Sequence, residues 1–116
     1  MASIPSKVVE SVSQFVSEVS LEIPVKKAIL FGSFAKGTYD EGSDIDLAIF
    51  SDYFESVSRV EGTTYLLIQA QSFEMDLEPI AFTWKEYDDR LGIVDEILET
   101  GIDVQEITGE IGDRGV

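Results

Sequence analysis

The sequence predicts one small α/β (α+β) domain, with a small mixed β-sheet flanked by helices. Three observations support this fold class. The chain has 116 residues, enough for a single hydrophobic core. Segments with helical and strand-like patterns alternate in the order αβαβαβαβ. Two segments, 25–31 and 45–50, contain the continuous apolar runs typical of buried central strands. We expect the domain to cover residues 1–107 and the Gly-rich, polar residues 108–116 to form a flexible C-terminal tail.

Residues 6–19 are predicted to form the first helix. Their apolar side chains recur at a spacing that places them on one helical face. Pro5 suits the entrance of a helix, and Pro24 prevents its continuation. The apolar positions are Val8, Val9, Val12, Phe15, Val16 and Val19.

Two predicted central strands follow, with a short helix and a polar turn between them. We expect strands at 25–31 and 45–50, because the apolar run in each would be buried on both faces. Between them, residues 33–36 can form a helical turn that Gly37 ends. The polar residues 38–43 favour a turn.

The second half of the chain is predicted to contain a helix and a third strand. Residues 51–59 read as a loop with a short helical piece, and 60–71 as a helix. Residues 73–82 read as a strand in which Pro79 indicates an edge or a bend. In that strand Phe73, Met75 and Leu77 would face one way, and Glu74, Asp76 and Glu78 the other.

A capping box marks the start of the last predicted helix. The Thr83 hydroxyl and the Glu86 carboxylate can each accept a hydrogen bond from a free N–H. We expect this helix to break near Gly92 and to end before Gly101. Residues 102–107 are predicted to add a short last strand.

Composition excludes several classes of function. With 8 basic and 23 acidic residues, the net charge of −15 opposes nucleic-acid binding. The absence of histidine and cysteine excludes imidazole bases, His- or Cys-ligated zinc and disulfides. No apolar run is long enough for a bilayer, and the N-terminus lacks a secretion signal, so we expect a cytoplasmic protein without a membrane partner. The negative charge serves either solubility or a basic protein partner.

The stretch from Gly32 to Asp46 carries the chemistry. A Gly32-Ser33 pair at the end of a strand leaves backbone N–H groups available to an anion. Asp44 and Asp46 begin the next strand and point to the same face. An anion-binding loop opposite two carboxylates suggests a phosphate ester held by divalent metal. Two such ions, roughly 3.5–4 Å apart, can activate the attacking oxygen and stabilise the leaving one.

These residues carry a resemblance to a known family. Gly32-Ser33, ten intervening residues and Asp44-Ile45-Asp46 match the signature of the DNA polymerase β-like nucleotidyltransferase superfamily. The stretch GSFAKGTYDEGSDIDLAIF resembles its minimal nucleotidyltransferase (MNT) group. Without the resemblance, the same residues read as a plain capped turn followed by a solvated strand start.

The resemblance implies a role for each matching residue. Gly32 and Ser33 would bind the β- and γ-phosphates of ATP, and Asp44 and Asp46 would ligate two Mg²⁺ ions together with the nucleotide. Many members of the group carry Arg after the Gly-Ser pair, where this chain has Phe34. Lys36 is then the candidate phosphate contact, with Lys26 and Lys27 as alternatives.

A third carboxylate would complete the catalytic and metal site and help to remove the proton from the attacking hydroxyl. The candidates are Asp76 and Glu78. We favour Asp76, because a helical crossover usually makes the third strand parallel to the second, so that their starts meet. Asp76-Leu77 also resembles the pattern of the group, while Glu78-Pro79 resembles a variant of it.

The resemblance also implies a biological role. Small MNT proteins pair with a helical HEPN protein in toxin–antitoxin systems, where the MNT protein acts as antitoxin by transferring AMP from ATP to a tyrosine of the toxin. Two alternatives are a non-catalytic antitoxin that neutralises its HEPN partner by occlusion and a nucleotide sensor. The sequence leaves the acceptor, the base preference and the oligomeric state open, a homo-oligomer included.

Overall fold

The computed structural model describes residues 4–107, which form a four-stranded mixed sheet. Its strands are β1 (Lys27–Phe31), β2 (Ile45–Phe50), β3 (Leu77–Phe82) and β4 (Ile102–Asp103), in the order β3-β2-β1-β4. β2 is antiparallel to β1 and parallel to β3, and β4 is antiparallel to β1. The predicted fold class is confirmed. The predicted tail, 108–116, lies outside the described residues.

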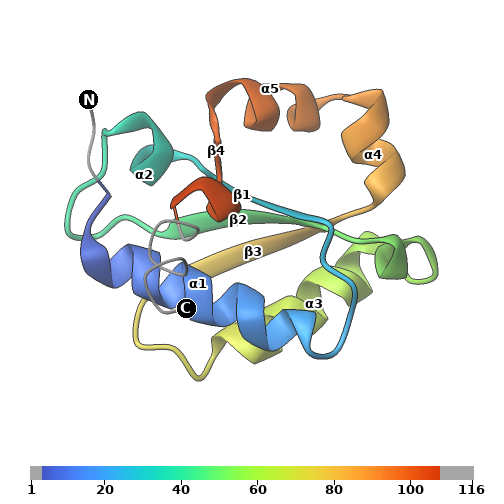
Figure 1. Ribbon diagram of the computed structural model, residues 1–116, viewed down its shortest axis with the longest axis horizontal. Coiled ribbons are helices and arrows are strands. Elements are labelled where there is room, and N and C mark those ends of the chain that lie inside the picture. The colour runs from blue at the N-terminus through green and yellow to red at the C-terminus, as the bar shows by residue number, and fades with distance from the viewer. Residues whose placement is uncertain (1–3, 108–116) are drawn as a thin grey trace.

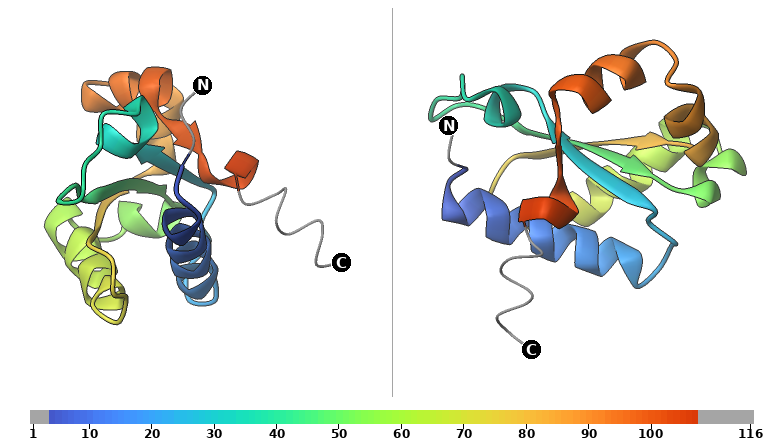
Figure 2. Two further views of the ribbon diagram at one scale, coloured as in Figure 1. Left: turned by 90° about the vertical axis from the view of Figure 1, so that its left-hand side faces the viewer. Right: turned by 45° about the horizontal axis from the view of Figure 1, so that its top comes forward.

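Helices cover both faces of the sheet (Figures 1 and 2). α1 (Ser6–Ser20) and α3 (Arg59–Ala70) pack on one face, and α2 (Ser33–Lys36), α4 (Trp84–Asp89) and α5 (Ile93–Thr100) lie on the other. Alternate residues of β2 serve the two layers. Ile45, Leu47 and Ile49 are buried under α1 and α3, while Ala48 and Phe50 are buried on the opposite face with Val94 and Ile97 of α5.

The apolar stripe of α1 faces the sheet, as predicted. Its buried residues are Val8, Val9, Val12, Phe15 and Val19. The helix runs to Ser20, and the Leu21 side chain that follows it is 87% exposed. The stripe therefore fixes the orientation of α1, and it places the first turns of the helix at the end of the sheet where β2 and β3 begin.

Capping boxes begin α3 and α4. At α4, Thr83 and Glu86 cap the helix reciprocally, which confirms the predicted box. An equivalent box, Ser58 with Glu61, begins α3 within a segment that the sequence analysis assigned to a loop. The short helical piece expected there is the 3₁₀ turn η1 (Asp52–Glu55). Each box satisfies N–H groups that a helix start otherwise leaves without partners.

The third strand begins at Leu77, four residues later than predicted. Phe73 and Met75 do pack against the core beside α1 and α3, and the Phe73 ring meets the Phe15 ring edge-on at 5.8 Å. Their backbone does not pair with β2, because the chain turns sharply where the Leu77 N–H donates to the Met75 carbonyl (3.0 Å). Alternating hydrophobicity thus predicted which side chains are inside, but not where pairing begins.

The outer edge of β3 is closed to further strand pairing. The carbonyls of Asp76 and Phe82 accept hydrogen bonds from the β2 side. The backbone N–H and C=O groups of residues 77, 79 and 81 therefore point away from β2, toward the outer edge. Pro79 has no N–H, and the Ala81 N–H donates to Thr63 Oγ1 (3.0 Å). The Ala81 carbonyl accepts from Arg59 Nη1 (2.8 Å). Side chains of α3 therefore protect this edge.

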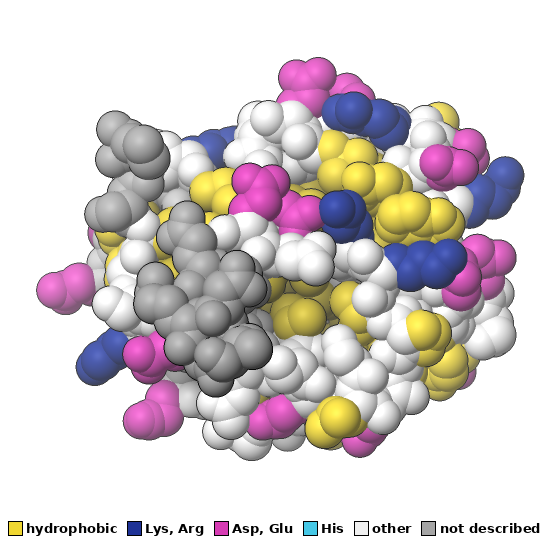
Figure 3. All heavy atoms as spheres, viewed as in Figure 1, with side chains coloured by type: hydrophobic (Ala, Val, Ile, Leu, Met, Phe, Trp, Pro, Cys, Tyr) yellow, Lys and Arg dark blue, Asp and Glu magenta, His cyan; other side chains and the backbone are white. Residues whose placement is uncertain are grey.

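The predicted helix 83–100 is broken into α4 and α5, as expected near Gly92. Arg90 and Gly92 both have positive φ, at 50° and 59°. Figure 3 shows apolar side chains exposed between α4, α5 and the sheet, and the large exposed ones at this break are Leu91 and Ile93. No helix in the described part of the chain is long and apolar enough to cross a membrane.

The predicted last strand, 102–107, is wrong beyond Asp103. β4 has only two residues, paired with Ile29 and Leu30, and residues 104–107 are helical. The physical reason is the spacing of the apolar side chains. Val104 is buried and Ile107 packs against the same core, and residues three apart share a face of a helix but not of a strand.

Candidate active site

The ends of β1 and the start of β2 bring the two halves of the motif together. Phe31, the last residue of β1, is the register partner of Asp46, so Gly32 leaves the sheet beside that carboxylate. Gly32 has φ 77°, and a Cβ built on it would lie 2.2 Å from Asp46 Oδ2. Only glycine fits here, because any other side chain would be strained at this φ and would displace the carboxylate.

Gly32 also begins the short helix α2 without a side-chain cap. The Lys36 N–H bonds to the Gly32 carbonyl and the Thr38 N–H to the Ser33 carbonyl, both at 3.0 Å. Gly37 ends the helix in the left-handed conformation, as predicted. The first N–H groups of α2 have no acceptor within the helix. Donors of this kind suit an anion, and they lie next to Asp46.

A hydrogen-bonded turn delivers Asp44 to the start of β2. Asp40 accepts from the Gly42 N–H through Oδ1 (2.9 Å) and from the Ser43 N–H through its carbonyl (3.1 Å). The Asp40 N–H donates to Ser43 Oγ (2.9 Å). The polar turn expected at 38–43 is therefore ordered by its own side chains, and the exposed Asp44 follows it directly.

Three carboxylates converge at this end of the sheet. Burial raises the pKa of Asp46 above its ordinary value, and the negative charges of Asp44 and Glu78 raise it further. Glu78 is the register partner of Asp46 across the parallel pair β2–β3. The cluster is self-repelling, and a bound cation would relieve that repulsion.

Asp76, the favoured third carboxylate, does not contribute to the raised pKa of Asp46. It precedes β3 at the sharp turn between Met75 and Leu77, and its carbonyl accepts the Ile45 N–H (2.8 Å). Its side chain lines a hollow beside Lys7 and Glu10 of α1. The premise that β3 runs parallel to β2 is confirmed, but the turn removes Asp76 from the strand. The register therefore favours Glu78, the reverse of the preference drawn from the sequence.

The donor set fits magnesium that arrives with a nucleotide. Within residues 4–107, no three acidic side chains stand close enough to hold a metal ion by themselves. Magnesium does not need such a cage, because it is usually held by one or two carboxylates, substrate phosphates and water. Asp44 and Asp46 are oxygen donors of that kind, and the start of α2, whose free N–H groups suit an anion, lies beside Asp46.

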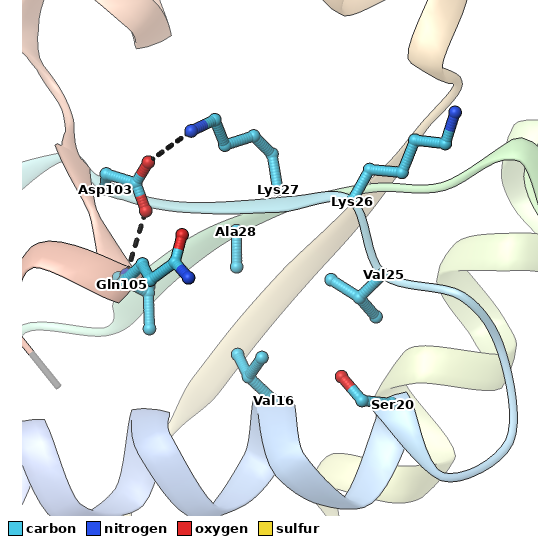
Figure 4. A pocket seen from close by; sticks show the side chains of 9 residues that line it. Val16, Ser20, Val25, Lys26, Lys27, Ala28, Asp103 and Gln105 are labelled. Atoms are coloured by element: carbon cyan, nitrogen blue, oxygen red, sulfur yellow. Dashed lines mark hydrogen bonds and ion pairs between the residues drawn. The ribbon is translucent and has the colours of Figure 1, made fainter. Parts of the chain in front are cut away.

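Lys26 and Lys27 do not belong to the site. They lie at the start of β1, whereas Gly32 follows its end. Lys27 pairs with Asp103 (2.7 Å), a hydrogen bond that raises the lysine pKa, and Figure 4 shows the two side chains pointing toward one another. Lys26 pairs with Asp52 (3.0 Å) and lies 5.2 Å from the centre of the Trp84 ring. Both therefore stabilise the opposite end of the sheet.

Lys36 is available for a phosphate, and a second lysine that the sequence analysis did not consider, Lys7, also has no carboxylate partner among the described residues. Of the basic residues between 4 and 107, all have a carboxylate partner within 4.0 Å except Lys7 and Lys36. Lys36 is exposed on the last turn of α2. Lys7 lies on the first turn of α1, where no acidic residue accompanies it. That local excess of positive charge is the sequence signal that could have identified Lys7.

Phe34 serves the core rather than the site. It is 5% exposed, and its ring stacks on Tyr39 with the centroids 4.6 Å apart. This pair holds α2 against the turn that carries Asp44. An arginine at this position, which the resemblance to the MNT group leads one to expect, would place a charge in the apolar cluster, whereas Phe34 packs within it.

Most of the chain matches a known protein family, and parts of it are similar to two named proteins. The family described as "Nucleotidyltransferase domain" matches residues 7–104. Two proteins of Methanocaldococcus jannaschii, each named "Putative protein adenylyltransferase", are similar to parts of the chain. One is 40% identical over 45 residues, covering 37% of this chain and 46% of that protein. The other is 61% identical over 28 residues, covering 24% and 28%. The chain thus aligns with less than half the length of either relative.

A solved structure shows the same fold. It is titled as a "putative nucleotidyltransferase from Sulfolobus solfataricus" and superposes with a TM-score of 0.63, covering 84% of this chain and 78% of the other. The sequences are 19% identical, so this likeness concerns the arrangement of helices and strands alone.

Proposed function

Since the chain belongs to the nucleotidyltransferase domain family, we propose that it transfers AMP from ATP to a hydroxyl group in a Mg²⁺-dependent reaction. The observation that carries this proposal is the contact between Gly32 and Asp46. It sets an anion-binding helix start and a group of carboxylates side by side, which is the arrangement a metal-bound polyphosphate requires.

The residues divide the work of binding and positioning. The N–H groups at the start of α2 and the Ser33 hydroxyl would hold the β- and γ-phosphates, with Lys36 adding positive charge. Asp44 and Asp46 would hold Mg²⁺, which when bound supplies charge neutralisation at the phosphates. Held in this way, the α-phosphorus would lie in line between the attacking and leaving oxygens.

The proton of the acceptor hydroxyl goes to a carboxylate, for which we propose Glu78. As the hydroxyl oxygen forms its bond to the α-phosphorus, the bond between the α-phosphorus and the α–β bridging oxygen breaks, and pyrophosphate leaves. Glu78 lies in register with Asp46 on the neighbouring strand, so it can act beside the reacting phosphate. Asp76, which the sequence favoured for this role, faces a different hollow.

For the acceptor we propose a protein hydroxyl, a tyrosine of a helical HEPN partner, with the chain acting as antitoxin in a toxin–antitoxin pair. The names of the two Methanocaldococcus jannaschii relatives, which describe protein adenylyltransferases, support a protein acceptor. The resemblance of the Gly32–Phe50 stretch to the MNT group supports the HEPN pairing.

The position of a radioactive label tests this reaction. The chain is incubated with Mg²⁺, the protein encoded by the neighbouring gene and ATP labelled either at the α- or at the γ-phosphate. We expect the acceptor protein to retain the α-label and not the γ-label. Retention of the γ-label would identify a kinase instead. An α-label retained equally with Asp44→Asn/Asp46→Asn would show that the proposed carboxylates are not the site.

A second candidate is neutralisation of the same partner by occlusion, or nucleotide sensing, without turnover. The specific observation in its favour is Phe34, which leaves Lys36 as the one unpaired cation on α2. Neutralisation of the toxin by Asp44→Asn/Asp46→Asn at the wild-type level would favour occlusion. Binding of ATP with Mg²⁺, but no release of pyrophosphate with the partner present, would favour a sensor.

A further inference from the structure

Two adjoining hollows open beside the first turns of α1. One, of about 540 Å³, and the other, of about 480 Å³, share the residues Lys7, Glu41, Ser43 and Met75. They are bounded by Pro5 and residues 6–11 of α1, the turn 39–43 and the loop 74–76, and together we call them the α1 groove. Figure 1 shows these segments at the left-hand end of the molecule, and the left view of Figure 2 looks onto that end. Each hollow has the size of a ligand site.

The α1 groove has an apolar floor and an acidic rim. Val8 and Phe34, 1% and 5% exposed, form part of the floor with the half-buried Tyr39 and Met75. Exposed carboxylates surround it, and none has an ion-pair partner among the described residues: Glu10, Asp40, Glu41, Glu74 and Asp76. Lys7 is the single basic residue among the described residues that line it.

The α1 groove adjoins the proposed site without being part of it. Ser43 lines both hollows and directly precedes Asp44, while Phe34 lines one hollow and directly follows Ser33. A chain segment in the groove would therefore end beside the carboxylates. The triphosphate of ATP is excluded from the groove, because its charge would be repelled by the acidic rim.

From this placement and charge, we propose that the α1 groove binds the acceptor segment of the protein substrate, and that this segment is basic with an apolar anchor beside its acceptor hydroxyl. The proposal rests on the proposed function and specifies the acceptor. The apolar side chain would pack on the floor, and lysine or arginine neighbours would pair with the rim. Long-range attraction from this rim would also speed the encounter with a basic partner.

The test uses short synthetic peptides that differ only in charge. Each contains one tyrosine next to a leucine, flanked by arginines in the first peptide and by glutamates in the second. Binding to the full chain is measured by fluorescence anisotropy, without ATP or Mg²⁺, so that it is independent of catalysis. We expect the arginine peptide alone to bind, and its binding to weaken as salt is raised.

Matched charge reversals locate the binding. Glu41→Lys/Glu74→Lys alters the rim, and Asp88→Lys/Glu99→Lys makes the same change in net charge at exposed positions of α4 and α5. We expect the first variant to lower affinity for the arginine peptide at least about tenfold, and the second to leave it within about twofold. Equal losses in both, or no binding of the arginine peptide to the wild type, would overturn the proposal.

A transfer assay separates the failure of this inference from that of the proposed function. Peptide binding that follows the expected pattern, with no label transferred from ATP to peptide or partner protein, supports the groove while contradicting nucleotidyl transfer. Label transfer that Glu41→Lys/Glu74→Lys leaves unchanged overturns the groove while nucleotidyl transfer stands.

Discussion

The α-carbon of Gly32 lies against the carboxylate of Asp46, so closely that a Cβ on Gly32 would be 2.2 Å from Asp46 Oδ2. One contact thus fixes the spacing between the loop that we propose binds phosphate and the residue that we propose binds metal. It follows from the antiparallel register in which Phe31 is the partner of Asp46. The position of the site is set by the pairing of β1 and β2.

Gly32→Ala should therefore abolish most activity. The new methyl group would displace the Asp46 carboxylate, and a misplacement of about 1 Å can cost roughly 10²-fold in rate. The strained φ should also lower the free energy of unfolding by about 1–3 kcal/mol. Transfer of α-label from ATP and chemical denaturation measure the two effects.

Gly92→Ala is the control for this substitution. Gly92 also has positive φ, at 59°, but a Cβ on it would meet nothing within 4 Å. We expect a stability loss of about 1 kcal/mol with normal transfer. If Gly32→Ala retained full activity, the contact between Gly32 and Asp46 would have no role in the site.

Asp46→Asn should stabilise the protein at pH 7 in the absence of divalent ions. The pKa of Asp46 is raised above its ordinary value of 3.8 by burial and by the charges of Asp44 and Glu78, so its ionised form disfavours the native state. The native state then binds more protons than the unfolded state between the two pKa values, and wild-type stability falls as pH rises through that window. The advantage of the variant should disappear below about pH 4.

Magnesium should act on the same charge. Adding Mg²⁺ should raise the thermal midpoint of the wild type more than that of Asp46→Asn, because a ligand stabilises the state that binds it. This measurement needs neither ATP nor an acceptor. Equal responses of the two proteins to Mg²⁺ would argue against metal binding at Asp46.

Glu78→Gln and Asp76→Asn distinguish the two candidate third carboxylates. Glu78 is in register with Asp46, and loss of a proton acceptor there should slow transfer by about 10²–10⁴-fold. Asp76 lines the α1 groove instead, so Asp76→Asn should leave kcat nearly unchanged and affect only the KM for the acceptor. The rates are compared with both ATP and the acceptor at saturation. The opposite pattern would restore the assignment of Asp76 drawn from the sequence.

Glu86→Gln should weaken the fold in a pH-dependent way. Burial tends to raise the pKa of Glu86, but hydrogen bonds from the Arg59 side chain and from the backbone N–H of Thr83 lower it below 4.5 overall. The stabilisation is therefore present above pH 4.5 and is lost as pH falls through the lowered pKa. At pH 7 we expect Glu86→Gln to cost about 1 kcal/mol, with little difference from wild type at pH 3.

Glu61→Gln is the matched control in the other capping box. Glu61 caps α3 with Ser58 but forms no ion pair among the described residues. Urea unfolding at pH 7 should show a smaller loss than for Glu86→Gln. Equal losses would mean that the ion pair of Glu86 with Arg59 contributes nothing beyond the cap.

Where local pattern decides structure, the sequence was sufficient. Strand 45–50 and helix 33–36 have the predicted bounds, since the first contains the continuous apolar run 47–50 and the second lies between two glycines of positive φ. The Thr83–Glu86 box needed only side-chain chemistry at fixed spacing. The fold class followed from the alternation of such segments.

Where tertiary pairing decides, the sequence was not sufficient. Asp76 and Glu78 are two residues apart, so the sequence predicts that both lie on the same face of a strand. Only the register of β3 against β2 shows that Glu78 is the partner of Asp46. Phe73 and Met75 have the alternation of a strand but pack from an irregular loop. The roles of Lys26 and Lys27 could not be predicted, because they depend on ion pairs with Asp52 and Asp103, which are distant in sequence.

Calorimetric titration of ATP, with and without Mg²⁺, into the wild type and Asp44→Asn/Asp46→Asn tests the central claim most directly. If the Gly32–Ser33 loop and the two aspartates form a single nucleotide site, the wild type should bind ATP saturably and only with Mg²⁺, and the variant should give no binding heat. Binding of equal strength to the variant, or no binding to the wild type at millimolar ATP, would contradict the account.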